Sequence, residues 1–174
     1  MNAILLPFMV LATIGFLLSL AAHIASILGL PVPGGNLVWS LHVGIFVVWF
    51  PAVLIGSRIN RGRPGSELWK NVLSGAPTWM RYAGYALFAY AAANFIWFFA
   101  VTRSGAALEG DSAFSEIRLF SGHWLVFYGA GFAILFSAYR NPRLLKKQRC
   151  LKGHDLSSTD VFCPSCGSKV LLDR

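Results

Sequence analysis

Four long apolar segments constrain the fold of this chain more than any other feature of its sequence. They cover residues 4–30, 37–56, 79–101 and 119–139. A helix needs about 20 residues to cross the hydrocarbon core of a bilayer, and each segment meets that length. A helix also satisfies its own backbone hydrogen bonds in lipid, where no water is present to do so. We therefore predict an all-α membrane protein with a four-transmembrane-helix bundle over residues 1–140.

The first apolar segment has one alternative interpretation, a signal peptide that is cleaved after export. A signal peptide starts with basic residues and has an apolar stretch of about 7–15 residues. Here no basic residue precedes the apolar stretch, and the stretch is longer than that. We expect the segment to stay as the first membrane helix.

The composition agrees with a membrane protein. Hydrophobic residues make up 56% of the chain and charged residues only 13%, which is too little charge to cover the surface of a soluble domain. The net charge of +8 could indicate nucleic-acid binding. However, the basic residues lie between and after the apolar segments, where membrane topology explains them better.

The distribution of charge predicts the orientation. Basic residues gather in the second connection and after the fourth segment, at Arg58, Arg61, Arg63, Lys70, Arg81, Arg140, Arg143, Lys146, Lys147 and Arg149. The first connection has no charge, and the third carries the acidic residues Glu109, Asp111 and Glu116. The positive-inside rule therefore places both termini and the second connection in the cytoplasm, with the helices in the cell (inner) membrane.

Three shorter features refine this picture. Pro51 lies inside the second apolar segment and predicts a kink. Residues 66–73 form either a short amphipathic helix in the interface or a plain connecting loop. Residues 141–149 form a basic juxtamembrane linker, which either contacts anionic lipid or serves only as a topology anchor.

The tail carries all three cysteines of the chain. Cys150 and His154 form a Cys-x3-His arm, and Cys163 and Cys166 form a Cys-x2-Cys arm. Three thiolates and one imidazole are a closed, tetrahedral set of zinc ligands, and a closed set predicts a structural site. The alternatives are a redox Cys-x-x-Cys pair, free cysteines or an iron site.

The tail also resembles the short zinc ribbons at the ends of many bacterial and archaeal proteins. The matching residues are Cys150, Gly153, His154, Phe162, Cys163, Pro164, Cys166 and Gly167. This resemblance implies a zinc-ribbon-like domain over residues 150–174 that orders the tail or docks another membrane or cytoplasmic protein. Nucleic acid is a less favoured partner, because no aromatic residues are interleaved with the basic ones.

Three histidines lie inside apolar segments, where ionisable residues are candidates for function. His23, His42 and His123 fall at one predicted depth in the outer half of the bundle, with Asn94 at a similar depth. Two histidines could ligate haem b, three could hold a metal ion, and all could form a proton path to a quinone. The alternative is that each histidine only packs or hydrogen-bonds with a neighbouring helix.

Two further segments resemble a group of uncharacterised bacterial four-helix membrane proteins. They are Arg118–Tyr128, which contains Phe-Ser-Gly-His-Trp, and Pro77–Arg81, which is followed by Asn94. This resemblance implies no activity.

Three functions fit the sequence. The favoured one is a non-enzymatic accessory, assembly or regulatory protein, because the sequence contains no nucleophile–base set and no phosphate-binding loop. The second is a membrane redox protein that binds haem b or a metal through the histidines. The third is a small oligomeric transporter, ranked last because no Asp, Glu, Lys or Arg lies within the four apolar cores.

Overall fold

A computed structural model describes residues 2–61, 64–103, 112–146, 148–156 and 160–170. Some residues that the predictions used lie outside these ranges: Arg63, Glu109, Asp111, Lys147 and the last four residues of the tail. Within the described ranges, four helices are long and apolar enough to cross a membrane, as predicted. They are α1 (Leu6–Ile27), α2 (Ser40–Ile59), α4 (Thr78–Arg103) and α5 (Ser112–Arg140).

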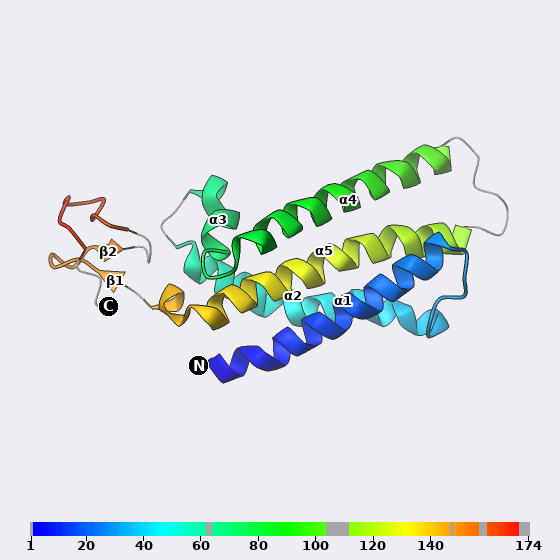
Figure 1. The fold of residues 1–174 in the computed structure, drawn as a ribbon, viewed down its shortest axis with the longest axis horizontal. Helices are drawn as coiled ribbons and strands as arrows, with labels where there is room; N and C mark the ends of the chain where they lie inside the picture. The colour runs from blue at the N-terminus through cyan, green and yellow to red at the C-terminus, as the bar shows by residue number, and fades with distance from the viewer. Residues whose placement is uncertain (1, 62–63, 104–111, 147, 157–159, 171–174) are drawn as a thin grey trace.

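The shorter elements connect and extend these helices. The described part of the chain contains the 3-10 helices η1 (Asn2–Leu5), η2 (Gly35–Trp39), η3 (Gly65–Glu67) and η4 (Pro142–Leu145), together with the short helix α3 (Leu68–Val72). The tail adds two strands, β1 (Gln148–Arg149) and β2 (Asp155–Leu156). Figure 1 shows α3, the start of α1 and the tail strands at one end of the bundle, here named the tail end.

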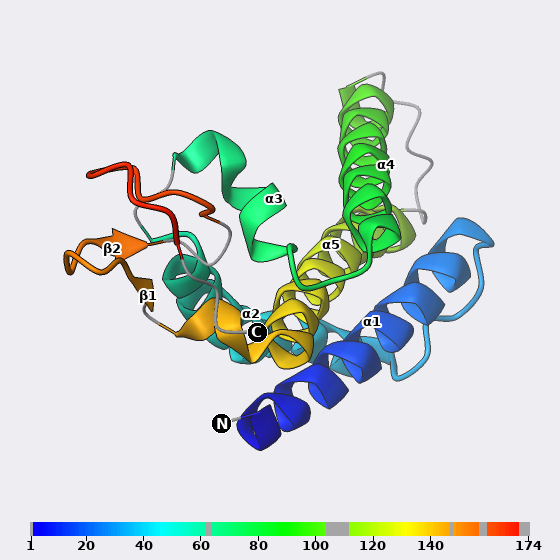
Figure 2. The same ribbon diagram turned by 60° about the vertical axis from the view of Figure 1, so that its left-hand side comes forward.

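Helix α5 is the centre of the bundle. Helices α1, α2 and α4 all pack against it, and α1 and α2 also pack against each other. The view in Figure 2 shows α4 diverging from α1, with α5 between them. Accordingly α5 carries fully buried side chains such as Trp124 and Leu135, whereas only Met80 and Asn94 are buried on α4. The other faces of α4 are therefore available to lipid or to a ligand.

Helix α5 begins earlier than predicted. The sequence suggested a start at residue 119, because Glu116 and Arg118 interrupt the apolar pattern. The helix nevertheless starts at Ser112, a residue type that favours helix starts. A helix that emerges from the bilayer can continue with charged residues on its surface. Pro51 lies inside α2, and the helix continues on both sides of it. The kink expected at Pro51 stays a prediction.

The second connection packs against the bundle. Of the two interpretations of residues 66–73, the helix is observed, but only over Leu68–Val72. Val72 and Leu73 are buried in the core, and Asn71 Nδ2 donates to Asn60 Oδ1 over 2.9 Å. The backbone N–H of Gly75 donates to Ser137 Oγ on α5 over 3.0 Å. These contacts fix α3 at the tail end.

The basic segment after α5 is also folded at its start. Pro142–Leu145 forms η4, and the side chain of Leu144 is buried against the bundle. The tail strands therefore begin close to the helices.

Candidate metal centre

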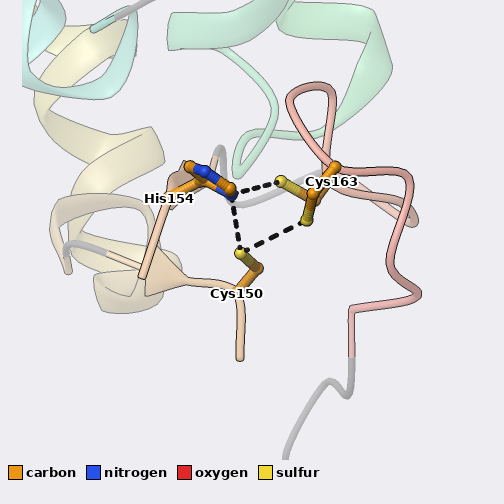
Figure 3. Close-up of side chains that lie close together, drawn as sticks. Cys150, His154 and Cys163 are labelled. Carbon is orange, nitrogen blue, oxygen red and sulfur yellow. Dashed lines mark hydrogen bonds between the residues drawn. The ribbon is translucent and has the colours of Figure 1, made fainter. Parts of the chain in front are cut away.

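Cys150, His154, Cys163 and Cys166 converge on one point in the tail. One ligand atom from each lies within 4.8 Å of the other three. Figure 3 shows Cys150, His154 and Cys163 pointing toward one another from two separate loops. The prediction that these four residues gather is confirmed, and such a group could hold a metal ion.

The first arm is the turn of a small hairpin. Strands β1 and β2 pair antiparallel, with Arg149 opposite Asp155. Between them, the N–H of Cys150 donates to the carbonyl of His154, and the N–H of Gly153 donates to the carbonyl of Cys150. Gly153 has φ +82°, a left-handed conformation that glycine adopts without strain. This tight turn brings the Cys150 and His154 side chains to the same side of the hairpin.

The second arm repeats this design. Phe162 pairs with Lys169 in an antiparallel bridge, and the N–H of Val170 donates to the carbonyl of Val161. The N–H of Gly167 donates to the carbonyl of Cys163, and Gly167 has φ +67°. Both glycines match the zinc-ribbon pattern in the sequence, but neither hairpin was predicted. The hairpins are too short for a strand pattern to be visible in the sequence.

The spacing of the ligand atoms fits a tetrahedral zinc ion. With bonds of about 2.3 Å to sulfur and about 2.0 Å to nitrogen, tetrahedral geometry requires about 3.8 Å between two sulfurs and about 3.5 Å between sulfur and nitrogen. The Sγ atoms of Cys150 and Cys166 are 3.8 Å apart, and His154 Nδ1 lies 3.4 Å from Cys150 Sγ and 3.8 Å from Cys163 Sγ. These three distances are close to the tetrahedral values, so the cluster could hold a metal ion such as zinc.

A disulfide does not account for the cluster. All three cysteines are free thiols, and the 3.8 Å between Cys150 and Cys166 far exceeds a sulfur–sulfur bond of about 2.05 Å. Cys163, in the Cys-x2-Cys arm, is almost fully buried at 2% exposure. A redox pair needs an accessible thiolate, so the geometry favours ligation.

Local hydrogen bonds prepare the cluster for ligation. The Ser168 hydroxyl, 3.1 Å from Cys166 Sγ, is the main cause that lowers the pKa of Cys166 to about 6. Hydrogen bonds to Cys166 and Cys150 raise the pKa of His154. Burial raises the pKa of Cys163. Because a metal binds the thiolate and the neutral imidazole, the raised pKa values of Cys163 and His154 oppose ligation, whereas the lowered pKa of Cys166 favours it.

The candidate intramembrane residues lie apart from this centre, toward the opposite end of the helices, and they form two groups. In the first, His23 is buried and uses both ring nitrogens, with Nδ1 2.8 Å from Ser121 Oγ and Nε2 hydrogen-bonded to the Tyr90 hydroxyl. Asn94 Nδ2 donates to the backbone carbonyl of Arg118 over 3.1 Å, and Arg118 Nε donates to Asn94 Oδ1 over 3.2 Å. These contacts join α1, α4 and α5.

The second group contains His42 and His123. Their rings are nearly parallel, with centroids 6.1 Å apart and an interplanar angle of 13°. Nδ1 of His42 accepts a hydrogen bond from Trp124 Nε1 over 3.0 Å. Among the described residues, the tail cluster is the one group of three or more metal-ligating side chains, so His23 does not combine with His42 and His123 into a three-ligand site.

Tyr90, Ser121 and Arg118, which contact His23 or Asn94, were not predicted from the sequence as members of this group. Ser121 and Arg118 were visible in the segment that resembles other membrane proteins, but only as neighbours of His123. A lipid-facing tyrosine such as Tyr90, 42% exposed, carries no pattern that predicts its hydrogen-bond partner.

Comparisons with known proteins found no relative of this chain. No protein family matches the chain, and neither does any curated protein or any solved structure. The likeness of the tail to zinc ribbons therefore rests on its own residues and their geometry.

Proposed function

We propose that this protein is a non-enzymatic component of the inner membrane whose cytoplasmic tail is a structural zinc ribbon that docks a protein at the membrane surface. The observation that carries the proposal is the convergence of four zinc-type ligand atoms within 4.8 Å. Four protein ligands leave no position for water or substrate, which is the pattern of structural rather than catalytic zinc.

Zinc is the metal that best suits this set. Thiolates with one imidazole in tetrahedral geometry are typical of zinc, whereas iron sites of this kind usually have four thiolates. A tail of this size has too small a core to fold alone, and a bound metal would supply the missing stability.

The distribution of basic residues supports a cytoplasmic location for the tail. Arg58 and Arg140 lie in the last turns of α2 and α5, and Arg81 lies in the first turn of α4. These helix ends are at the tail end of the bundle (Figure 1), and basic residues stay on the cytoplasmic side. Zinc bound to thiolates also suits a reducing compartment, where cysteines do not form disulfides.

Exposed apolar side chains on the tail support docking. Leu151 is 85% exposed beside the first ligand, and Phe162 is 59% exposed beside the third. Val161 is exposed next to Phe162. The backbones of Val161 and Phe162 belong to the second hairpin, but these exposed side chains are not buried in the tail, so we assign them to contact with a partner protein.

Limited proteolysis of sealed vesicles tests this function. In inside-out vesicles the tail should resist trypsin, and a zinc chelator should expose cleavage after Lys152 and Lys169. In right-side-out vesicles the tail should stay protected with or without chelator. Cleavage in right-side-out vesicles would refute the orientation, and chelator-independent cleavage would refute the structural role of the metal.

Photo-cross-linking tests the docking role. A photoreactive residue in place of Leu151 should give a discrete protein adduct in cells, and Cys163→Ser should abolish it by unfolding the ribbon. A photoreactive residue at Tyr82, which is 66% exposed on α4, is the control and should not give that adduct. A Leu151 probe that labels only lipid, or that labels the same protein in the Cys163→Ser background, would contradict docking.

A redox role remains the second candidate, on one observation. The ring centroids of His42 on α2 and His123 on α5 are 6.1 Å apart, a separation that two axial ligands of one haem b iron could have. Protein purified from haem-replete cells should then show a Soret band that His123→Ala removes. Colourless protein would exclude this role.

A further inference from the structure

A groove opens between four helices near the tail end. It has a volume of about 390 Å³, within the range of small-molecule sites. Its lining comes from α2, α3, α4 and α5 and is almost entirely apolar: Trp49, Trp69, Gly84, Tyr85, Leu87, Phe88, Val126, Phe127 and Ala130. The groove exists because α4 packs mainly against α5 and diverges from the rest of the bundle (Figure 2).

Gly84 lets the ring of Trp69 lie directly against α4. A Cβ atom added at Gly84 would be only 3.0 Å from Trp69 Cζ2. Because α3 is fixed to the bundle, the ring has little room to retreat. Trp69 therefore closes the tail end of the groove.

Two buried hydrogen-bond donors lie in this region, one on Trp69 in the groove lining and one on Arg81, whose guanidinium reaches the residue after Trp69. Trp69 Nε1 and Arg81 Nε are both buried, and neither has a hydrogen-bond partner among the described residues. Arg81 precedes Gly84 by three residues on α4, so both face α3, and Arg81 Nη2 reaches the carbonyl of Lys70 at 3.5 Å. Buried donors without acceptors are rare and unfavourable, which points to an acceptor supplied by a ligand.

We propose that this groove binds one anionic phospholipid. The phosphate accepts hydrogen bonds from Trp69 Nε1 and Arg81, and one acyl chain lies along the apolar wall formed by α4 and α5. The positive charges of Arg81 and Lys70 complement the phosphate and the anionic headgroup. The surrounding bilayer supplies this ligand directly to a groove that opens between its helices. The proposal depends on membrane insertion but not on metal in the tail.

Native mass spectrometry of the full-length protein in detergent tests the proposal. The probes are phosphatidylglycerol and phosphatidylcholine with identical acyl chains, and glycerol 3-phosphate as a probe without chains. We expect one phosphatidylglycerol per chain to bind in preference to phosphatidylcholine, and glycerol 3-phosphate not to compete. Trp69→Phe keeps an aromatic ring but removes the indole N–H, and it should weaken phosphatidylglycerol binding about tenfold.

Two controls make this result specific. Trp79→Phe removes the same N–H from an α4 residue that is 65% exposed and outside the groove, so binding should be unchanged. Arg81→Gln removes the second donor group, the Arg81 guanidinium, and it tests the proposal independently if Trp69→Phe does not fold. Only variants that elute as the wild type does on size exclusion are compared.

Several outcomes would overturn the proposal. They are equal binding of the two lipids, unchanged phosphatidylglycerol binding in both Trp69→Phe and Arg81→Gln, and effective competition by glycerol 3-phosphate, which would indicate a free-phosphate site. Retention of an uncharged lipid or of a second protein chain in the groove would also overturn the proposal. Zinc content measured on the same sample reports the proposed function separately, so the two can fail independently.

Discussion

His23 Nδ1 on α1 lies 2.8 Å from Ser121 Oγ on α5, although the two residues are 98 positions apart in the chain. The Ser121 hydroxyl is also 3.2 Å from the carbonyl of Arg118, one turn earlier on α5. The two side chains thus connect the first and last membrane helices inside the bundle, where no water can replace a lost partner.

Ser121→Ala should therefore destabilise the bundle. The change leaves His23 Nδ1 without its partner, and hydrogen bonds between membrane helices contribute about 0.6–1.7 kcal/mol. Unfolding in detergent by titration with a denaturing detergent measures this difference. Ser40→Ala is the matched control, because Ser40 is exposed and its hydroxyl donates to the carbonyl of Leu37 in the same helical segment rather than to another helix. Equal stability of both variants would show that the His23 contact contributes nothing.

Tyr128 gives a prediction about two glycines. Its hydroxyl donates to the carbonyl of Leu41 over 2.7 Å, and its ring fits between α1 and α2 because Gly15 and Gly44 have no side chains. A methyl group at Gly15 would overlap ring carbons of Tyr128, whereas one at Gly44 would overlap only the hydroxyl oxygen. Each Gly→Ala change should destabilise the protein by about 1–3 kcal/mol.

A double-mutant cycle separates the two contacts. Tyr128→Phe removes the hydroxyl but keeps the ring, so it should rescue Gly44→Ala and leave Gly15→Ala as unstable as before. The readout is the free energy of unfolding of each single and double variant in detergent. Rescue of Gly15→Ala, or no rescue of Gly44→Ala, would contradict the packing of Tyr128 described here.

Ser168 predicts the pH at which the tail releases its metal. Its hydrogen bond is the largest cause that lowers the pKa of Cys166 to about 6, and a metal binds the thiolate form. Ser168→Ala should raise the pKa of Cys166, so protons compete with the metal at a higher pH. Metal release on acidification should then have its midpoint at a higher pH than in the wild type.

The control for this prediction lies in the same arm. Ser165→Ala alters an exposed side chain between Cys163 and Cys166 and should not move the midpoint. Titration of the purified protein with a chromogenic zinc indicator measures both variants. A midpoint that stays constant, or moves to lower pH, in Ser168→Ala would contradict the assigned role of this hydroxyl.

The helices and the ligand cluster could be predicted from sequence because each has a strong local signal. A continuous apolar run specifies a membrane helix, and the Cys-x3-His and Cys-x2-Cys spacings specify ligands. The interior of the bundle has no such signal. His23 and His42 share one predicted depth, yet their partners depend on how each helix rotates about its own axis.

The central position of α5 could not be predicted from the sequence either. Its small residues and Trp124 suggest contact with a neighbour but do not say with which helix. The groove beside Trp69 depends on the divergence of α4 and on how the second connection folds. Residues 66–73 could be interpreted in two ways from their pattern alone, because a helix of five residues is too short to show a period.

Elemental analysis of the detergent-purified, full-length protein tests the central claim most directly. The account predicts one zinc ion per chain, which is lost in Cys163→Ser and retained in Ser165→Ala. A folded wild-type tail without bound zinc, or zinc that persists in Cys163→Ser, would contradict it.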